Sequence, residues 1–161
     1  MIPIRVIAIP TAIAETVRST SQAPRYGHPA HTELASGYGP CRHCLRTFHI
    51  GQERRTLFTY DPFDGIEKVP LPGPIFIHTD ACTRYPEEAG YPADLRKHAA
   101  VLSAYARGQR LIAQTHVDDD DHDAALEQLL KRADVDYVEV RDKLAGCYDF
   151  RVERVNSSAA G

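Results

Sequence analysis

Residues 100–117 read AVLSAYARGQRLIAQTHV, and this stretch decides the fold class. Two largely apolar runs, 100–106 and 110–117, flank the tripeptide Arg107-Gly108-Gln109. Such a pair of runs around a short turn that contains glycine predicts an antiparallel β-hairpin. A hairpin in the middle of the chain argues against the regular alternation of strands and helices that builds a parallel sheet.

Segments on both sides of the hairpin also carry strand patterns. They are 2–9, 41–48, 54–60, 75–78, 135–141 and 147–155. Together with the hairpin they predict a mostly antiparallel sheet of about seven strands. In the last of them, simple alternation places Tyr148, Phe150 and Val152 on one face and Cys147, Asp149, Arg151 and Glu153 on the other.

Two or three helices accompany the predicted sheet. Thr11 follows Pro10 and caps a short helix to residue 17. Leucines at helical spacing predict a second helix over 125–133, and the preceding aspartates at 118–123 suit its N-terminus. The segment 94–98 is expected to form one helical turn. These elements predict a single α+β domain over 1–155, followed by a frayed tail at 156–161.

Residues 19–40 are rich in Ser, Gly and Pro and contain scattered Tyr and His. A segment of that length without periodic structure is uncommon inside a compact domain. It is usually a lid, a binding loop or a disordered insert, and a plain surface loop is an equal alternative.

Composition excludes several classes of function. The chain has 161 residues and a formal net charge of -3, which provides no basic surface for nucleic acid. No apolar run approaches the roughly 20 residues of a membrane helix. The apolar run at the N-terminus is broken by Pro3 and Pro10, so it makes a poor signal peptide. We therefore expect a cytoplasmic protein with reduced thiols and no nucleic-acid or membrane partner.

Four cysteines in such a compartment indicate a metal site, a reactive thiol or core residues rather than a disulfide framework. Cys41-Arg42-His43-Cys44 presents two thiols from one turn, and His78-x-x-x-Cys82 offers a second pair. Four nitrogen and sulfur ligands in two close pairs suit tetrahedral zinc. Arg42 and Arg46 crowd the first pair and favour the thiolate form.

Three observations weigh against a zinc site. The two pairs lie farther apart than in ordinary zinc ribbons, the Gly and Pro of a zinc knuckle are absent around Cys44, and free cysteines are often simply buried. A redox pair at Cys41 and Cys44 lacks the strand-then-helix context of thioredoxin-like proteins.

A second set of residues suits recognition of an anion. Cys147 lies near Arg151 and downstream of Arg141, and an adjacent guanidinium gives a thiol reason to ionise. Arginine also binds carboxylate and phosphate by bidentate contacts. The acidic run at 118–123 lacks the spacing and central Gly of a calcium loop, which favours its interpretation as a helix cap.

Several short phrases resemble a bacterial family known as domain of unknown function 1203, and the similarity runs from about residue 4 to 155. They are Pro40-Cys41-Arg42, Gly73-Pro74-Ile75-Phe76-Ile77-His78, Cys82 with Tyr85, Val138-Glu139-Val140-Arg141, Gly146-Cys147-Tyr148 and Arg151-Val152-Glu153-Arg154. The resemblance implies one small domain of unassigned activity, and it supplies no catalytic residues. It favours a pocket that family members share, formed around the dipeptides Cys41-Arg42 and Gly146-Cys147, over a site that depends on Cys44.

The leading hypothesis is a small protein that binds, and in an enzymatic form transforms, a small polar or anionic molecule under the 19–40 segment. Its catalytic candidates are His78, Arg141 and Cys147, and its ligand-binding candidates are Cys41, Arg42, Tyr85 and Arg151. His78 would act as acid or base near neutral pH. The first alternative is a structural or interaction module that binds zinc through Cys41, Cys44, His78 and Cys82, and the second is a thiol redox protein.

Overall fold

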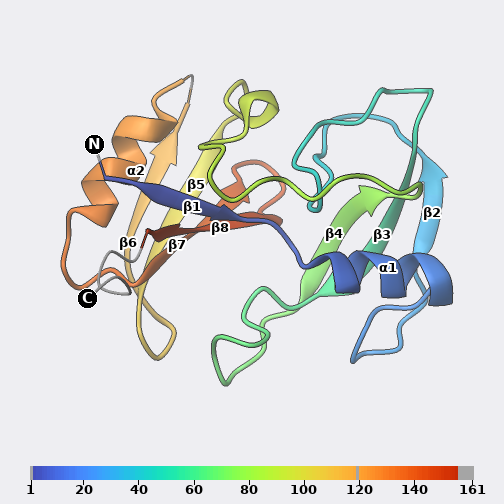
Figure 1. Ribbon diagram of the computed structural model, residues 1–161, viewed down its shortest axis with the longest axis horizontal. Coiled ribbons are helices and arrows are strands. Elements are labelled where there is room, and N and C mark those ends of the chain that lie inside the picture. Colours follow the sequence, from blue (N-terminus) through green and yellow to red (C-terminus); the bar gives the residue numbers. More distant parts are fainter. Residues whose placement is uncertain (1, 119, 156–161) are drawn as a thin grey trace.

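The computed structural model describes residues 2–118 and 120–155. Over these residues the chain forms two α-helices, one 3-10 helix and eight strands, and every pair of strands is antiparallel. The α+β class with mostly antiparallel strands is therefore confirmed. The strands form two sheets rather than one (Figure 1). The predicted tail at 156–161 lies outside the described residues.

The larger sheet has five strands in the order β1-β8-β7-β5-β6. The central hairpin has the predicted bounds, and helix α2 packs across one face of the sheet (Figure 1). The buried core between them includes Leu102, Leu126, Val138 and Phe150. The elements are β1 (Ile4–Ile7), β5 (Ala100–Ala106), β6 (Arg110–Val117), α2 (His122–Leu130), β7 (Tyr137–Asp142) and β8 (Tyr148–Arg154).

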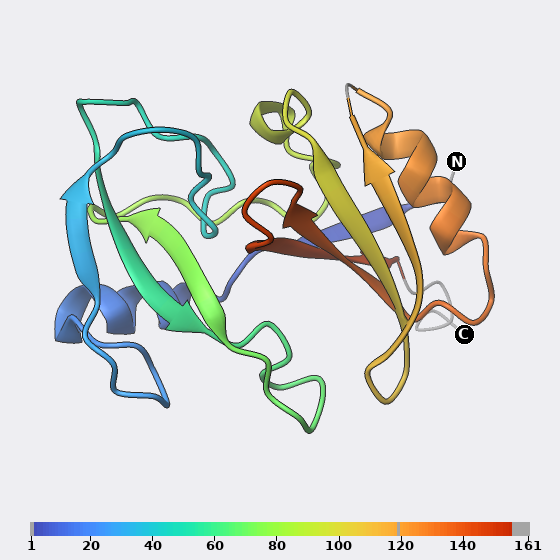
Figure 2. The same ribbon diagram turned by 180° about the vertical axis from the view of Figure 1, so that it is seen from behind.

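The smaller sheet has three strands in the order β2-β3-β4, and helix α1 lies along it (Figures 1 and 2). A second core includes Ala14 and Val17 of the helix, Phe58 and Ile77 of the sheet, and two of the cysteines, Cys41 and Cys44. The elements are α1 (Thr11–Thr20), β2 (His31–Leu34), β3 (Arg54–Tyr60) and β4 (Gly73–His78).

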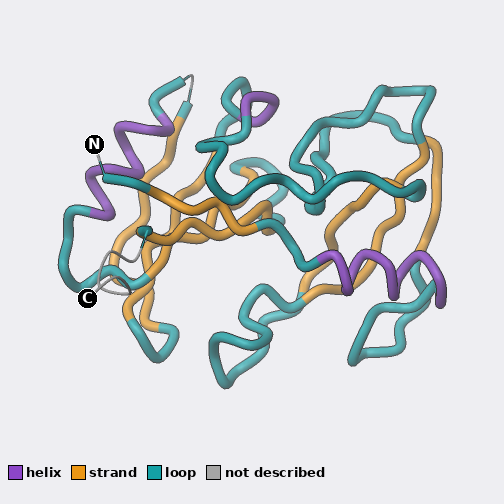
Figure 3. The backbone as a smooth tube through the Cα atoms, in the orientation of Figure 1, coloured by secondary structure: helices purple, strands orange, loops and turns teal. Residues whose placement is uncertain are grey.

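A long segment without regular structure, 79–92, leaves the end of β4 and crosses from the smaller sheet to the larger one (Figure 3). It ends at the short helix η1 (Ala93–Leu95). Backbone hydrogen bonds tie it to both parts of the molecule: Tyr85 N–H donates to His43 O at 2.9 Å, and Val6 N–H donates to Glu87 O at 2.9 Å. The segment therefore carries Cys82 past the 41–46 region.

Two segments differ from the sequence-based expectation. Residues 41–48 form a turn instead of a strand, with a single bridge between Pro40 and Thr47. The buried cysteines resemble the apolar residues of a strand, but the backbone around them forms a turn. Within 19–40, the structure contains strand β2 and a bridge between Gln22 and Pro29.

Strand β8 also departs from simple alternation. Phe150 pairs with Val140, but Tyr148 pairs with Arg141, so Asp149 is an extra residue in a β-bulge. The bulge turns Tyr148 to the face opposite Phe150, and Tyr148 packs in the core of the smaller sheet. The expectation that Tyr148 shares a face with Phe150 is therefore wrong.

The acidic run does not cap α2 in the expected way. Asp121 occupies the N-cap position of α2 without a hydrogen bond from its side chain. Asp118 pairs with Lys143 at 2.9 Å and Asp123 pairs with Arg96 at 2.6 Å. Among the described residues of the run these exposed side chains form surface ion pairs, and Asp119 lies outside the described residues.

Candidate metal centre

The turn at 41–46 presents both thiols of the Cys41-x-x-Cys44 motif to the same side. Cys41 N–H donates to Arg46 O at 2.9 Å, and Leu45 N–H donates to Cys41 O at 2.8 Å. Leu45 has a φ of 56°, which is the left-handed conformation that a zinc knuckle normally assigns to glycine. The Leu45 side chain is buried in the core of the larger sheet, and this burial offsets the backbone strain. The missing glycine therefore does not exclude a metal-binding turn.

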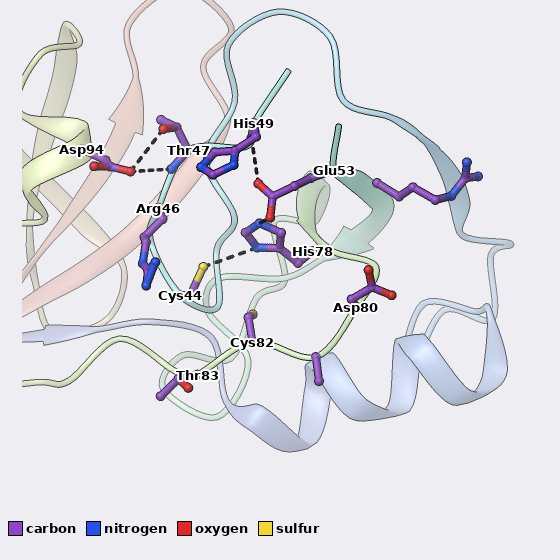
Figure 4. Close-up of a pocket in the computed structure, with 12 residues that line it drawn as sticks. Cys44, Arg46, Thr47, His49, Glu53, His78, Asp80, Cys82, Thr83 and Asp94 are labelled. Carbon is purple, nitrogen blue, oxygen red and sulfur yellow. Dashed lines mark hydrogen bonds and ion pairs between the residues drawn. The ribbon is translucent and has the colours of Figure 1, made fainter. Parts of the chain in front are cut away.

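Three neighbouring segments hold this turn in place. Arg42 N–H donates to Phe76 O on β4 at 3.0 Å, and Ile9 N–H donates to Arg42 O at 3.2 Å. The 79–92 segment adds the bond to His43 O. The end of β4, where His78 lies, and the segment that carries Cys82 are therefore fixed beside the turn, and Figure 4 shows His78 and Cys82 next to Cys44.

The potential ligand atoms of Cys41, Cys44, His78 and Cys82 all lie within 4.8 Å of one another. Cys41 Sγ is 3.8 Å from Cys82 Sγ, and Cys44 Sγ is 3.4 Å from His78 Nδ1. A tetrahedral ion with bonds of about 2.3 Å to sulfur and 2.0–2.1 Å to nitrogen requires edges of roughly 3.8 Å and 3.5 Å. The four side chains can therefore hold one metal ion.

The ring of His78 is oriented by a carboxylate. His78 Nε2 lies 3.0 Å from Glu53 Oε2, and Glu53 Oε1 accepts a hydrogen bond from the His49 N–H at 2.7 Å (Figure 4). This hydrogen bond lowers the pKa of Glu53, burial opposes the effect, and His78 adds to it. An ionised Glu53 holds the proton on Nε2, so Nδ1 is left to face the thiols. Metal-binding histidines commonly have such a carboxylate partner.

Hydrogen-bond donors also surround the sulfur atoms. The backbone N–H of His78 donates to Cys41 Sγ at 3.2 Å. Arg18 of α1 donates to Cys82 Sγ at 3.3 Å, and His43 Nδ1 lies 3.1 Å from the same sulfur. Thr11 Oγ1 is 2.9 Å from His43 Nε2, so both ring nitrogens of His43 have a polar partner. Arg18 and Thr11 are far from the cysteines in sequence, and no pattern in the sequence indicates them.

Arg42 does not act on the thiols as expected. Its Nε donates to Tyr148 O at 2.8 Å, and its NH2 lies 3.2 Å from Asp149 Oδ1. Arg46 lines the cavity next to the cluster. Among the described residues, the guanidinium group that contacts a sulfur atom is that of Arg18.

The thiols and the imidazole share protons unequally in the absence of metal. Hydrogen bonds from Cys41 and Cys44 lower the pKa of Cys82 well below its usual range, although burial opposes this. Hydrogen bonds to Cys41 and Cys82, together with burial, raise the pKa of Cys44. Burial disfavours the charged form of His78, but contacts with Cys41 and Cys82 outweigh it and raise the pKa of His78 to about 10. One sulfur thus carries negative charge beside a protonated thiol and a protonated imidazole.

The other predicted site residues lie elsewhere. Arg42 and Cys147 line a cavity of about 270 Å³ between the two sheets. Arg141 and Cys147 line an adjacent cavity of about 320 Å³, and Arg141 pairs with the buried Glu139 at 2.9 Å. His78 lines neither cavity, so the structure does not bring it together with Arg141 and Cys147.

Tyr85 and Arg151, the remaining ligand-binding candidates, lie outside these cavities. Tyr85 donates its hydroxyl to Gly90 O at 3.0 Å within the 79–92 segment. Arg151 donates to Glu153 at 2.7 Å along β8. Both side chains have structural partners on their own element or loop.

Fold and site together define a small α+β protein with a candidate Cys3His metal centre. Residues 38–154 match the model of the family described as Protein of unknown function (DUF1203), and the chain belongs to this family. No curated protein and no solved structure matches the chain. All four potential metal ligands lie within the matched residues, whereas Arg18 precedes them. No helix among the described residues is long and apolar enough to cross a membrane.

Proposed function

We propose that the protein is a zinc-binding structural module and that Cys41, Cys44, His78 and Cys82 are the ligands. The observation that carries this proposal is the convergence of the four ligand atoms within 4.8 Å from two pairs distant in sequence. Three thiolates and one imidazole are a typical donor set for structural zinc. The spacing also leaves room for a single ion between the ligands.

A structural role is supported by what the metal would connect. The ligands come from the turn at 41–46, from the end of β4 and from the 79–92 segment, and Arg18 adds α1. The crossing segment has no regular secondary structure, so few backbone hydrogen bonds hold it. A zinc ion would cross-link it to the smaller sheet and thereby stabilise the junction.

Elemental analysis of the purified protein tests this function. We expect about one equivalent of zinc per chain in the wild type and less than about a tenth in Cys44→Ser. Cys147→Ser, which removes the one cysteine outside the cluster, is the matched control and should keep its zinc. Replacement by cobalt should give the visible absorption of a tetrahedral thiolate site. If the wild-type protein stays free of zinc after reconstitution with zinc in the reduced state, the proposal is refuted.

The cavity between the two sheets favours a second candidate function, the binding of a small polar molecule. Its walls combine the aromatic rings of Tyr38 and Phe76 with the polar groups of Asp142 and Cys147, whereas the guanidinium of Arg42 is held by Tyr148 O and Asp149. A bound molecule would shield Cys147, so a small-molecule library should be screened for compounds that slow alkylation of this thiol. A tryptophan at the exposed Ala145, which lines the mouth, should abolish such protection. Equal protection in Ala145→Trp would place the binding elsewhere.

A further inference from the structure

We propose that Cys82 is the site of oxidative modification in the cluster, and that attack by hydrogen peroxide there leads to a disulfide with Cys41 and to release of the metal. This role deepens the proposed function, because it concerns the regulation of the same zinc site. Access, charge and the position of the second sulfur each support it.

The three cysteines differ in access. Cys41 is fully buried and Cys44 is 7% exposed, whereas Cys82 is only half-buried. A polar cavity of about 290 Å³ next to the cluster is lined by Cys44, His78 and Cys82, but not by Cys41 (Figure 4). A small reagent that enters this cavity therefore meets Cys82 more readily than the other two thiols.

The charges around Cys82 suit a reaction with peroxide. Arg18 NH2 and His43 Nδ1 lie 3.3 Å and 3.1 Å from its sulfur. When the thiolate attacks peroxide, the O–O bond breaks and negative charge develops on the departing oxygen. N–H groups beside the sulfur stabilise that charge and help to position the peroxide. Among the described residues, no arginine side chain donates a hydrogen bond to the sulfur of Cys41 or Cys44.

The first step makes a sulfenic acid. The Cys82 thiolate donates an electron pair to one peroxide oxygen, an S–O bond forms, and hydroxide leaves and takes a proton to become water. The sulfur is oxidised and the peroxide is reduced. The Cys41 thiolate then attacks Cys82 Sγ, the S–S bond forms, the S–O bond breaks, and a second hydroxide leaves as water. Two thiolates, one peroxide and two protons thus give one disulfide and two water molecules.

The position of Cys41 makes it the partner for the second step. Its sulfur lies 3.8 Å from Cys82 Sγ, so a disulfide of about 2.05 Å needs an approach of roughly 2 Å. The product removes two of the four ligands from the metal, which is then released. It also replaces the lost metal with a covalent link between the 41–46 turn and the 79–92 segment, so the junction stays closed.

Peptide mapping distinguishes this disulfide from the Cys41–Cys44 bond that a Cys-x-x-Cys motif usually forms. Arg42 separates the two cysteines of the motif, so trypsin places them in different peptides, 26–42 and 43–46. Cys82 falls in peptide 69–84. After hydrogen peroxide treatment of the zinc-loaded full chain, we expect peptide 26–42 linked to peptide 69–84. Zinc release, followed with a colorimetric chelator, should match the disulfide in amount and in rate.

Variants test the roles of the surrounding groups. Arg18→Met should slow zinc release by roughly tenfold, because a charge-assisted contact to the reacting sulfur is lost. Its zinc content is measured first, so that a slower reaction is separated from a weaker site. Cys147→Ser should release zinc at the wild-type rate.

Two outcomes would overturn the proposal: a bond between peptides 26–42 and 43–46, or zinc that stays bound under peroxide. A wild-type rate in Arg18→Met would overturn the role of that guanidinium. Zinc content before peroxide reports separately on the metal site. A chain that binds zinc but forms a different disulfide thus leaves the proposed function intact, whereas a chain that binds none refutes both.

Discussion

Glu53 contacts the ring of His78 at 3.0 Å, and the proposed metal site depends on the orientation that this contact gives the ring. Glu53→Gln removes the negative charge but retains an acceptor for the Nε2 proton. Carboxylates that hydrogen-bond to a metal-binding histidine typically contribute 10- to 100-fold to metal affinity. Because the Glu53 side chain is 35% exposed, we expect zinc affinity to fall by about tenfold, the lower end of this range. A competition titration with a chromophoric chelator measures it.

The matched control for that titration is Glu88→Gln, an exposed carboxylate in the neighbouring crossing segment. It changes the net charge equally, so its zinc affinity should remain at the wild-type value. Equal losses in the two variants would indicate a general electrostatic effect and would remove the role assigned to the contact between Glu53 and His78.

Individual residues also show how far the sequence allows prediction. The four potential ligands can be recognised from their type and spacing only as an alternative site, because the wide gap between the two pairs and the missing glycine weigh against zinc. The donors to Cys82 cannot be recognised from the sequence. Arg18 is 64 residues away and reaches the sulfur only because α1 packs on the smaller sheet. Arg42 is the reverse case: its neighbours in sequence suggest a role at the thiols, but its side chain turns toward Asp149 on the bulge of β8.

At the scale of elements, the 41–46 turn sets backbone strain against burial. Leu45→Gly would relieve the cost of a φ of 56°, roughly 1 kcal/mol. It would also remove a fully buried side chain from the core of the larger sheet, which costs about 3–5 kcal/mol. The second effect is larger, so we expect a net loss of about 2–4 kcal/mol in unfolding free energy, measured by urea denaturation of the zinc-free protein.

A second substitution separates the two effects in that turn. Leu45→Ala keeps the strained backbone and loses most of the side chain, so it should be less stable than Leu45→Gly or equal to it. If Leu45→Gly were more stable than the wild type, the strain would exceed the burial and the balance argued for this turn would be reversed.

Elements whose pattern is local are predicted well, and those that depend on distant pairing are not. The hairpin of β5 and β6 has the predicted bounds, since its apolar runs and its turn are adjacent in sequence. The bulge at Asp149 cannot be predicted from the sequence, because nothing in β8 itself shows which residue of β7 pairs with each of its residues. The 41–48 segment is expected to form a strand, but its apolar residues do not alternate with its polar ones, and its hydrogen bonds close a turn.

At the scale of the whole molecule, the division into two sheets is the feature that the strand pattern does not reveal. Which strands share a sheet is decided by pairing partners far apart in sequence, such as β1 with β8. The chain passes between the two sheets along β1 and α1 and again along 79–92, and the cysteine cluster lies beside both crossings. Loss of metal should therefore loosen the junction and the smaller sheet more than the larger one.

Removal of zinc by a strong chelator should lower the melting temperature by roughly 10 °C, since a ligand at a thousand times its Kd contributes about 4 kcal/mol and each kcal/mol corresponds to about 2–4 °C at this size. Hydrogen exchange should accelerate in the 41–46 turn and the 79–92 segment, while the β5–β6 hairpin keeps its protection. Uniform acceleration along the chain would show instead that the metal stabilises the fold as one cooperative unit.

Acidification, like chelation, should remove zinc, because ligand groups of the cluster bind protons. In the metal-free protein the pKa of His78 is raised to about 10 and the pKa of Cys44 is also raised, so both groups are protonated at neutral pH. Zinc must displace both protons, and its apparent affinity should therefore fall at least about a hundredfold for each unit by which the pH decreases below neutrality. The stability that zinc provides is thus present at neutral and higher pH and is lost as the pH falls.

Chelator competition between pH 8 and pH 6 measures how steeply the zinc affinity depends on pH. An affinity that does not change with pH would mean that the ligands are already deprotonated. The proton arrangement assigned to the cluster would then be wrong.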